Sequence, residues 1–371
     1  MTEKPQPKSK QRNAEIEFLR FWAAFSVCAY HVGIFSGGLL AVDFFFILTG
    51  ALLTRSLVLS PQSAQRTILS YVYKQIKSLY PELCVAILVT LVLKICLGHA
   101  SIAYIMNTIA NDLCFLRMSR FTQPWNGACP PTWYLSSMLM ATILTYPVIS
   151  RIKNPLLLFC LACFPLTFLI LRAGGMQENS FADLYGITYS GNYRAIGGIL
   201  MGATVAHTAA LLKKNGITNK HRMITFLLKW VSIVGISVLF IHQFRPLEPC
   251  ILLFSSICLT LIFVHIDAHR KEGILSSLCR LLGRLSLPLY LSHWIILTEL
   301  APRLKTIPAI NQYHLFYPCL VLLIIVSTCF TYAGAQYIRL ALHSHTARKQ
   351  KALNGSQPKL HHEKALSKHT E

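Results

Sequence analysis

Long apolar segments recur along almost the whole chain and are separated by short polar loops. A helix needs about 20 apolar residues to cross the hydrocarbon core of a bilayer, and segments of this length leave no room for a separate soluble domain. The pattern predicts an all-α, polytopic membrane protein of about ten transmembrane helices. The predicted spans are 17–35, 39–60, 79–98, 134–150, 155–172, 194–212, 225–243, 249–266, 286–302 and 315–338.

Polar segments flank the predicted transmembrane domain, residues 17–338, on both sides. Residues 1–16 are basic and contain no apolar core or cleavage site of small residues, so we expect a cytoplasmic N-terminal segment that is not removed. Residues 339–371 lack apolar periodicity, which predicts a basic, disordered cytoplasmic tail. Its positive charge would favour contact with anionic membrane lipids.

Composition and charge agree with this division. Hydrophobic residues make up 54% of the chain and charged residues 13%, and the mean hydropathy is +0.49. The net charge of +21 would suggest nucleic-acid binding in a soluble protein, but here the topology explains it. Of the 35 lysine and arginine residues, 27 fall in segments on one side of the predicted spans. Because cytoplasmic loops are enriched in these residues, both termini should be cytoplasmic. We expect the protein to lie in the inner, or cytoplasmic, membrane.

The twelve cysteines are spread singly, mostly within apolar segments, where a thiol behaves as a small hydrophobic group. No spacing typical of a zinc or redox site occurs, so we expect no metal cofactor. Cys114 and Cys129 both fall in a predicted outer loop. A disulfide between them and two free thiols are both compatible with the sequence, since spacing does not show proximity.

The first predicted span contains two basic side chains, Arg20 and His31, eleven residues apart. At about 100° per residue, this spacing amounts to three helical turns plus about 20°, and it separates the two residues by about 16 Å along the axis. Both should therefore share one face, with Arg20 near the cytoplasmic boundary and His31 well inside the membrane. An extended phosphopantetheine arm has a comparable length, so Arg20 could bind a phosphate while a thioester reaches His31.

Asp43 follows the predicted turn at Gly37 and Gly38 and should lie at a depth similar to that of His31. Its carboxylate could accept a hydrogen bond from one ring N–H of His31, fix the tautomer and make the imidazole a stronger base. Structural roles remain open for each residue. Arg20 could extend to the interface, His31 could be a hydrogen-bonded core residue, and Asp43 could cap the second helix.

The opening segments FLRFWAAFSVCAYH and VDFFFILTGALL resemble the membrane acyltransferase-3 family. The hallmark of that family is a basic residue, ten others and a histidine, followed by an Asp–Phe–Phe stretch that ends in Ser–Gly. Arg20, His31 and Asp43 match this pattern, and Thr49 stands where serine is usual, which keeps a hydroxyl group. The resemblance extends from about residue 16 to residue 338.

Four later segments resemble further motifs of the family, and each carries candidate residues. YVYKQIKSLYP resembles its basic stretch before Tyr–Pro, which implies donor binding by Lys74 and Lys77, although arginines are common there. PPTWYLSSM, NYRAIGGILMGA and LLGRLSLPLYLSHWIIL supply candidates for an acceptor site or cavity, namely Trp133, Arg194, Tyr290 and His293. Structural roles also stay open: an interfacial aromatic belt for Trp133, an interfacial anchor for Arg194 and a structural hydrogen bond for His293. The glycines of the third segment, Gly197, Gly198 and Gly202, would allow close helix packing.

The resemblance implies transfer of an acyl group, commonly acetyl from cytosolic acetyl-CoA, to a hydroxyl of a carbohydrate such as O-antigen, exopolysaccharide or peptidoglycan. Acyl-CoA would be a co-substrate, and His31 would act as general base. An acyl-histidine intermediate is the alternative to direct transfer. Two other classes stay open from the residues alone. One is a transporter of small molecules or lipid-linked sugars with Asp43 and His31 as a proton relay, and the other is a non-enzymatic scaffold.

Overall fold

The computed structural model describes residues 12–355, with gaps at 61–66, 99–100, 123–124, 126, 174–179, 185, 267–272 and 313. The described part is almost entirely helical, which confirms the predicted all-α class; a two-residue antiparallel pair, β1 (Asp183–Leu184) with β2 (Thr188–Tyr189), is its only sheet. The long helices are α1 (Ala14–Val32), α2 (Ala41–Leu57), α3 (Ile68–Cys96), α5 (Thr132–Arg151), α6 (Pro155–Ala173), α7 (Ser190–Lys214), α9 (Arg222–Ile241), α10 (Cys250–Val264), α11 (Ile274–Ile295) and α14 (Phe316–Gly355).

Shorter elements connect these helices. They are η1 (Gly38–Leu40), α4 (Ile102–Thr108), η3 (Ile109–Leu113), α8 (Ile217–Lys220), η4 (Arg245–Leu247), η5 (Ile296–Leu300), α12 (Ala301–Lys305) and α13 (Pro308–Gln312). Both η3 and η5 are single π-helical turns that continue a neighbouring α-helix. Such turns are rare and often occur at functional sites.

Seven helical segments within the described residues are long and apolar enough to cross a membrane. They correspond to α2, α3, α6, α7, α9, α11 with its continuation, and α14. The other three predicted spans coincide with α1, α5 and α10, of which α10 is a shorter apolar helix. The structure thus supports a polytopic membrane protein, whereas the number ten and the cytoplasmic placement of both termini stay predictions.

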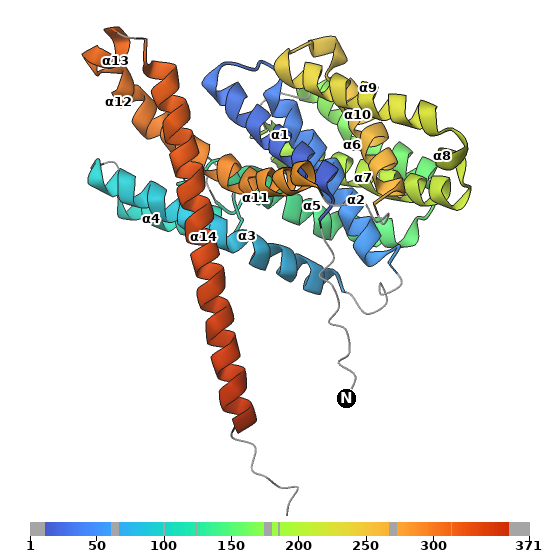
Figure 1. Cartoon of the computed structure of the whole chain (residues 1–371), viewed down its shortest axis with the longest axis horizontal. Helices are drawn as coiled ribbons and strands as arrows, with labels where there is room; N and C mark the ends of the chain where they lie inside the picture. The colour runs from blue at the N-terminus through green and yellow to red at the C-terminus, as the bar shows by residue number, and fades with distance from the viewer. Residues whose placement is uncertain are drawn as a thin grey trace, which may run out of the picture.

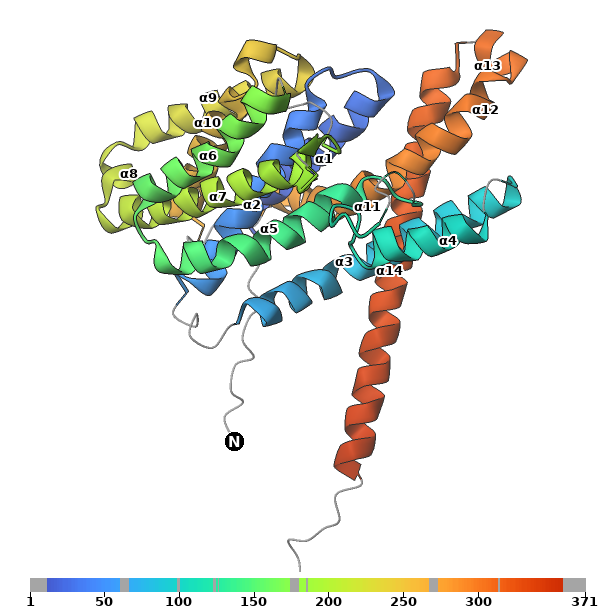
Figure 2. The same ribbon diagram turned by 180° about the vertical axis from the view of Figure 1, so that it is seen from behind.

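The helices form a bundle around α2 and α7, with α3, α4 and α14 on one side of it (Figure 1). Figure 2 shows the same arrangement from behind, where α5, α6 and α7 run side by side. Helix α1 packs mainly on α11, α2 on α7, and α14 on α3 and α11. The first predicted hairpin therefore exists in the chain, but each of its helices has its most extensive contact with a helix from much later in the sequence.

Glycines permit the close contact of α2 with α7. A Cβ atom added at Gly50 would collide with the backbone of Ile199, and one added at Gly202 would collide with the backbone of Ile47. Small residues let transmembrane helices approach to backbone contact, because packing replaces the hydrophobic effect in lipid. The predicted packing role of the glycines in α7 is thereby confirmed for Gly202.

Local sequence signals define the two ends of α1. The Asn13 side chain caps the first turn by accepting from the backbone N–H groups of Glu15 and Ile16 at 3.0 and 3.2 Å. The helix ends at Gly33, which has a φ of 85° in the left-handed region that favours glycine. His31 therefore lies in the last turn of the helix, directly before the chain turns toward α2.

Helix α14 is much longer than the predicted last span. Its 40 residues correspond to about 60 Å, twice the thickness of the hydrocarbon core, and Figure 1 shows it extending well beyond the bundle. Residues 339–355, which we assigned to a disordered tail, thus continue the helix. Residues 356–371 and residues 1–11 of the predicted terminal segments lie outside the described residues.

Candidate active site

His31 and His293 lie against each other at the contact between α1 and α11. Their ring centroids are 5.4 Å apart and their planes differ by 24°. His31 is partly exposed, and the edge of Trp294 contacts its ring at a centroid distance of 5.0 Å. His293 is completely buried. The structure therefore joins two of the predicted site residues, from opposite ends of the sequence, into one histidine pair.

The hydrogen bonding of His293 determines which of its ring nitrogens carries the proton. Nδ1 lies 3.1 Å from the backbone oxygen of Leu289, one helical turn earlier. Because a carbonyl oxygen only accepts hydrogen bonds, Nδ1 must be the protonated nitrogen of the neutral ring. Nε2 then carries a lone pair, and this buried atom has no hydrogen-bond partner within the described structure.

Asp43 and Arg194 form a buried ion pair between α2 and α7. Arg194 donates from Nε to Oδ1 at 3.1 Å and from a terminal nitrogen to Oδ2 at 2.7 Å. Arg194 also donates to Ser180 Oγ and to the backbone oxygen of Leu39, each at 3.2 Å. With 1% of its surface exposed, Arg194 is not an interfacial anchor.

This pairing corrects the predicted role of Asp43. In the part of the chain that the structure describes, no hydrogen bond joins Asp43 to His31; both carboxylate oxygens accept from Arg194 instead. A guanidinium offers two parallel donors that match a carboxylate, so it is a stronger partner than a single imidazole N–H. Asp43 is therefore not the orienting group that we expected beside His31.

Aromatic rings connect the ion pair with the histidine pair. The Arg194 guanidinium lies 6.0 Å from the ring of Trp133, and Trp133 contacts Phe46. Phe46 contacts Tyr134, which contacts Tyr290. The contacts continue from Tyr290 to His293, with 6.2 Å between the ring centroids. Trp133, Arg194, Tyr290 and His293 thus belong to one connected set of side chains.

Tyr290 also has a clear structural function within this set. Its hydroxyl donates to the backbone oxygen of Pro131 at 3.1 Å, so it attaches α11 to the start of α5. The side chain is 5% exposed. This bond favours packing as the role of Tyr290 and leaves substrate contact by its hydroxyl as a prediction.

Arg20 is held at the opposite end of α1 by Glu17, a residue that our sequence analysis did not identify. Arg20 donates to Glu17 Oε1 at 3.2 Å, and 31% of its side chain is exposed. Glu17 is buried against α11, where a Cβ atom at Gly283 would collide with the Glu17 side chain. The signal for Glu17 in the sequence was an acid three residues before Arg20, the i, i+3 spacing of helix neighbours.

The two predicted donor-binding lysines are not part of this set. Lys74 and Lys77 are exposed on the first half of α3, while Val72 on the other face is buried. Their three-residue spacing places both on one outward face of the helix. A role for them in donor binding stays a prediction that would depend on charge at the surface.

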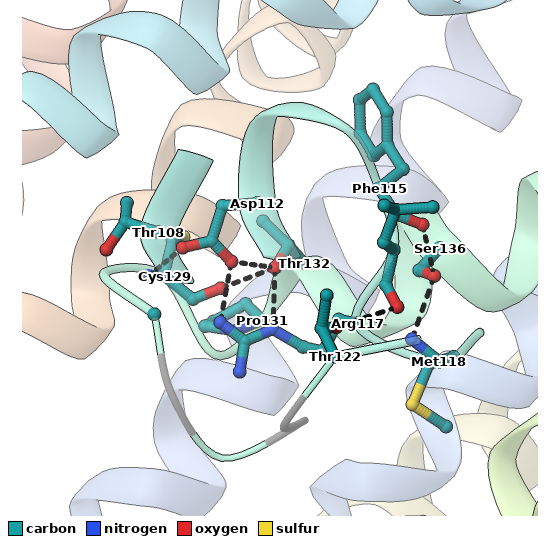
Figure 3. A network of polar contacts seen from close by, with 12 residues as sticks. Thr108, Asp112, Phe115, Arg117, Met118, Thr122, Cys129, Pro131, Thr132 and Ser136 are labelled. Atoms are coloured by element: carbon teal, nitrogen blue, oxygen red, sulfur yellow. Dashed lines mark hydrogen bonds and ion pairs between the residues drawn. The ribbon is translucent and has the colours of Figure 1, made fainter. Parts of the chain in front are cut away.

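A second polar network lies in the segment before α5 (Figure 3). Asp112 Oδ1 accepts from Arg117 at 2.6 Å and from Thr132 Oγ1 at 2.6 Å, and Asp112 Oδ2 accepts from the backbone N–H of Cys129 at 3.0 Å. Asp112, Arg117 and Thr132 are fully buried. We did not predict this cluster, because the sequence showed only a polar loop between two spans.

The cysteines near this network are both free thiols. Cys129 is buried and Cys114 is exposed, so the disulfide left open by the sequence does not form in this structure. Cys129 Sγ instead lies 3.6 Å from the backbone oxygen of Leu291 in α11. Among the described residues, no group of three or more histidine, cysteine, aspartate or glutamate side chains is arranged to hold a metal ion.

Fold and site together define a polytopic helical membrane protein with a histidine pair inside the helix bundle and a basic residue three turns away. A family model described as an acyltransferase domain matches residues 13–333, nearly the whole chain. The protein therefore belongs to the acyltransferase-3 family, as its motifs indicated, and is an acyltransferase. Searches of curated proteins and of solved structures gave no match.

Proposed function

We propose that this acyltransferase moves an acetyl group from cytosolic acetyl-CoA to a hydroxyl of a carbohydrate, either a cell-surface glycan or its lipid-linked precursor. Family membership supports acyl transfer. The histidine pair is the observation that carries the proposal, since it places the imidazole of His31 inside the bundle with one side still accessible. A base in such a position can act on a bound hydroxyl while most water is excluded.

His31 is the proposed general base. It takes the proton of the acceptor hydroxyl as the hydroxyl oxygen attacks the thioester carbonyl carbon. The new C–O bond forms, the C–S bond breaks, and the proton passes from His31 to the departing thiolate of CoA. This direct route needs both substrates at once, whereas an acyl-histidine intermediate would release CoA before any acceptor binds.

Arg20 is the proposed donor-binding residue. A guanidinium carries five N–H donors, and the described structure shows one hydrogen bond from Arg20 to a protein side chain, Glu17. The remaining donors suit the phosphates of CoA, and a partly exposed position gives access from outside the bundle. The distance of about 16 Å between Arg20 and His31 along α1 suits an extended donor that reaches from phosphate to thioester.

We place the protein in the inner membrane with both termini in the cytosol. Arg20 then faces the compartment that contains CoA, and His31 lies toward the opposite side, where lipid-linked glycans are available. The partners in this arrangement are acyl-CoA, a carbohydrate acceptor and membrane lipids. The basic loops that support this orientation do so through the positive-inside rule.

Mass spectrometry of surface polysaccharide tests this function. Cells that carry the gene should contain one more acetyl group per modified repeat than cells that lack it. Cells that express His31→Ala at equal abundance should match the cells without the gene. Full acetylation with His31→Ala would remove His31 from the reaction, and identical glycans with and without the gene would overturn the proposed acceptor.

The ion pair of Asp43 with Arg194 disfavours the transporter alternative. A proton relay between Asp43 and His31 requires the two groups to exchange protons, but both oxygens of Asp43 are engaged by Arg194. Substrate movement without any acyl donor would nevertheless revive that alternative.

A further inference from the structure

The lone pair of His293 Nε2 is a buried hydrogen-bond acceptor that faces no partner in the described structure. Most buried polar side-chain atoms in folded proteins have a partner, so each exception calls for an explanation. His293 is 0% exposed, which means that bulk water does not solvate this atom. A partner for it must come from the protein, from an ordered internal water or from a bound substrate.

The tautomer of His293 makes Nε2 an acceptor and never a donor in the neutral ring. The backbone oxygen of Leu289 fixes the proton on Nδ1. A helical turn holds this carbonyl in place, so the ring orientation is determined by the backbone of α11. His293 therefore has the property that we expected of Asp43, namely an acceptor held rigidly near His31.

His31 is the nearest ring that can supply the missing donor. Two imidazoles joined by an N–H···N hydrogen bond of about 3 Å have centroids about 5 Å apart. The centroids of His31 and His293 are 5.4 Å apart, and the planes are 24° from parallel. Trp294 and Tyr30 contact the His31 ring in T-shaped arrangements at centroid distances of 5.0 and 5.2 Å. A hydrogen bond from His31 to Nε2 requires a rotation of the His31 ring, because this bond is not formed in the described structure.

We propose that His293 is a positioning residue for His31. In this arrangement Nε2 of His293 accepts a hydrogen bond from one ring N–H of His31, which leaves the other ring nitrogen of His31 unprotonated and available as base. The chain of bonds runs from His31 N–H to His293 Nε2, and from His293 Nδ1–H to the Leu289 carbonyl. This inference rests on the proposed function of His31.

The proton transfers balance without any change in His293. His31 gains the proton of the acceptor hydroxyl and becomes an imidazolium, so its bond to His293 Nε2 becomes charge-assisted and stronger. His31 then gives that proton to the thiolate of CoA and returns to its neutral form. His293 keeps its Nδ1 proton throughout, and its stabilisation of the imidazolium is greatest while charge is present on His31.

Two substitutions separate this role from a purely structural one. In His293→Asn, the amide can replace the Nδ1–H donor to Leu289, but no atom replaces Nε2. In His293→Gln, the longer side chain can place its amide oxygen near the position of Nε2. A positioning role predicts that His293→Asn lowers kcat about 10- to 100-fold with little change in KM for either substrate, and that His293→Gln recovers most of the loss.

The matched control is His207 in α7, another histidine with a buried Nε2 that has no partner among the described residues. His207→Asn and His207→Gln should both keep kcat within about twofold, because His207 is not part of the histidine pair. If His293→Asn is as active as the native enzyme, or more active than His293→Gln, a structural role is indicated and our inference is overturned. If the native enzyme itself transfers no acetyl group, the proposed function is overturned, and this result is distinct from a failure of the role proposed for His293.

A measurement on the native protein decides the question where the variants do not fold. Solid-state ¹⁵N NMR of protein labelled in its histidine rings should show His293 protonated on Nδ1, with Nε2 shifted as the acceptor of a hydrogen bond. This bond should be present when a non-reactive acetyl-CoA analogue is bound. A His293 ring protonated on Nε2 would contradict the inference.

Discussion

The Asp112–Arg117–Thr132 network and the His31–His293 pair both lie inside the bundle and are polar, yet their hydrogen bonding differs. Each oxygen of Asp112 accepts at least one hydrogen bond, at 2.6 to 3.0 Å. In the histidine pair, by contrast, Nε2 of His293 has no partner among the described residues. A saturated buried network rigidifies one conformation, whereas an unsaturated one retains the capacity to bind something further. We therefore interpret the first as a scaffold, and the open acceptor of the second supports the chemistry that we propose for His31.

His31→Ala should produce the largest effect on activity. Loss of a general base lowers the rate about 10²- to 10⁴-fold, and the partly exposed position predicts little loss of stability. Turnover of labelled acetyl-CoA by purified protein would measure the first effect, and thermal unfolding the second. Normal turnover in a folded His31→Ala protein would place the chemistry elsewhere.

Asp112→Ala should destabilise the fold and leave the activity of the folded molecules unchanged. It leaves Arg117 buried without its carboxylate, which we expect to lower the free energy of unfolding by about 3–5 kcal/mol. The molecules that remain folded should keep a normal kcat, since the hydrogen bonds of Asp112 join it to Arg117, Thr132 and Cys129 and not to the histidine pair. Unfolding in denaturant combined with activity per folded molecule tests both parts. An unchanged midpoint would show that the network does not stabilise the segment before α5.

Arg20→Ala should raise KM for acetyl-CoA about 10- to 100-fold, because a hydrogen bond to a charged group contributes about 1.5–3 kcal/mol. The value of kcat should change little. Arg20→Lys keeps the charge but loses the two-pronged geometry, so it should lie between Arg20→Ala and the native protein. An Arg20→Ala enzyme with native KM for acetyl-CoA would remove Arg20 from the donor site.

Replacing both Lys74 and Lys77 by alanine should have a smaller effect, since the structure leaves them exposed and apart from the aromatic set. We expect a rise of about threefold or less in KM for acetyl-CoA, and it should disappear as salt screens the surface charge. A large, salt-independent rise would restore these lysines as direct ligands of the donor.

The exposed ion pair of Arg120 with Asp183 should contribute least to the stability of the fold. The hydrogen bond from Arg120 lowers the pKa of Asp183 below its usual value of 3.8. Such a group stabilises the fold above its unfolded pKa, and this contribution is lost as the pH falls through the lower folded pKa. Because the pair is exposed, Asp183→Asn should leave the unfolding curve at neutral pH unchanged within error. A clear shift would mean that the β1–β2 turn is more strongly coupled to the bundle than its exposure suggests.

The sequence predicted the helices well, because runs of apolar residues are a strong signal in a membrane protein. The eleven-residue spacing of Arg20 and His31 also required nothing beyond helix geometry. The sequence did not predict which helices pack against each other. Lipid is as apolar as a helix interface, so hydropathy does not show which helices touch. The pairing of α1 with α11 brought His31 to His293, and that of α2 with α7 brought Asp43 to Arg194 instead of His31.

The sequence also did not predict the buried polar network in the segment before α5. Asp112, Arg117 and Thr132 fall in a polar stretch without periodicity, and their convergence depends on the path of the chain through η3 to α5. The positive φ of Gly127 and the lack of space for a Cβ atom beside Arg117 and Asp112 show how closely that path fits the network. A polar segment between two spans gives no sequence signal for such a fit.

Acetyl transfer by the purified protein in lipid vesicles is the decisive test. Labelled acetyl-CoA is supplied on the side of the N-terminus and a lipid-linked glycan in the membrane, and CoA release and acetylated glycan are followed together. We expect one CoA released for each acetyl group on the glycan, with both dependent on His31. Movement of the glycan without acetyl-CoA, or glycan acetylation that His31→Ala leaves intact, would contradict the mechanism proposed for this protein.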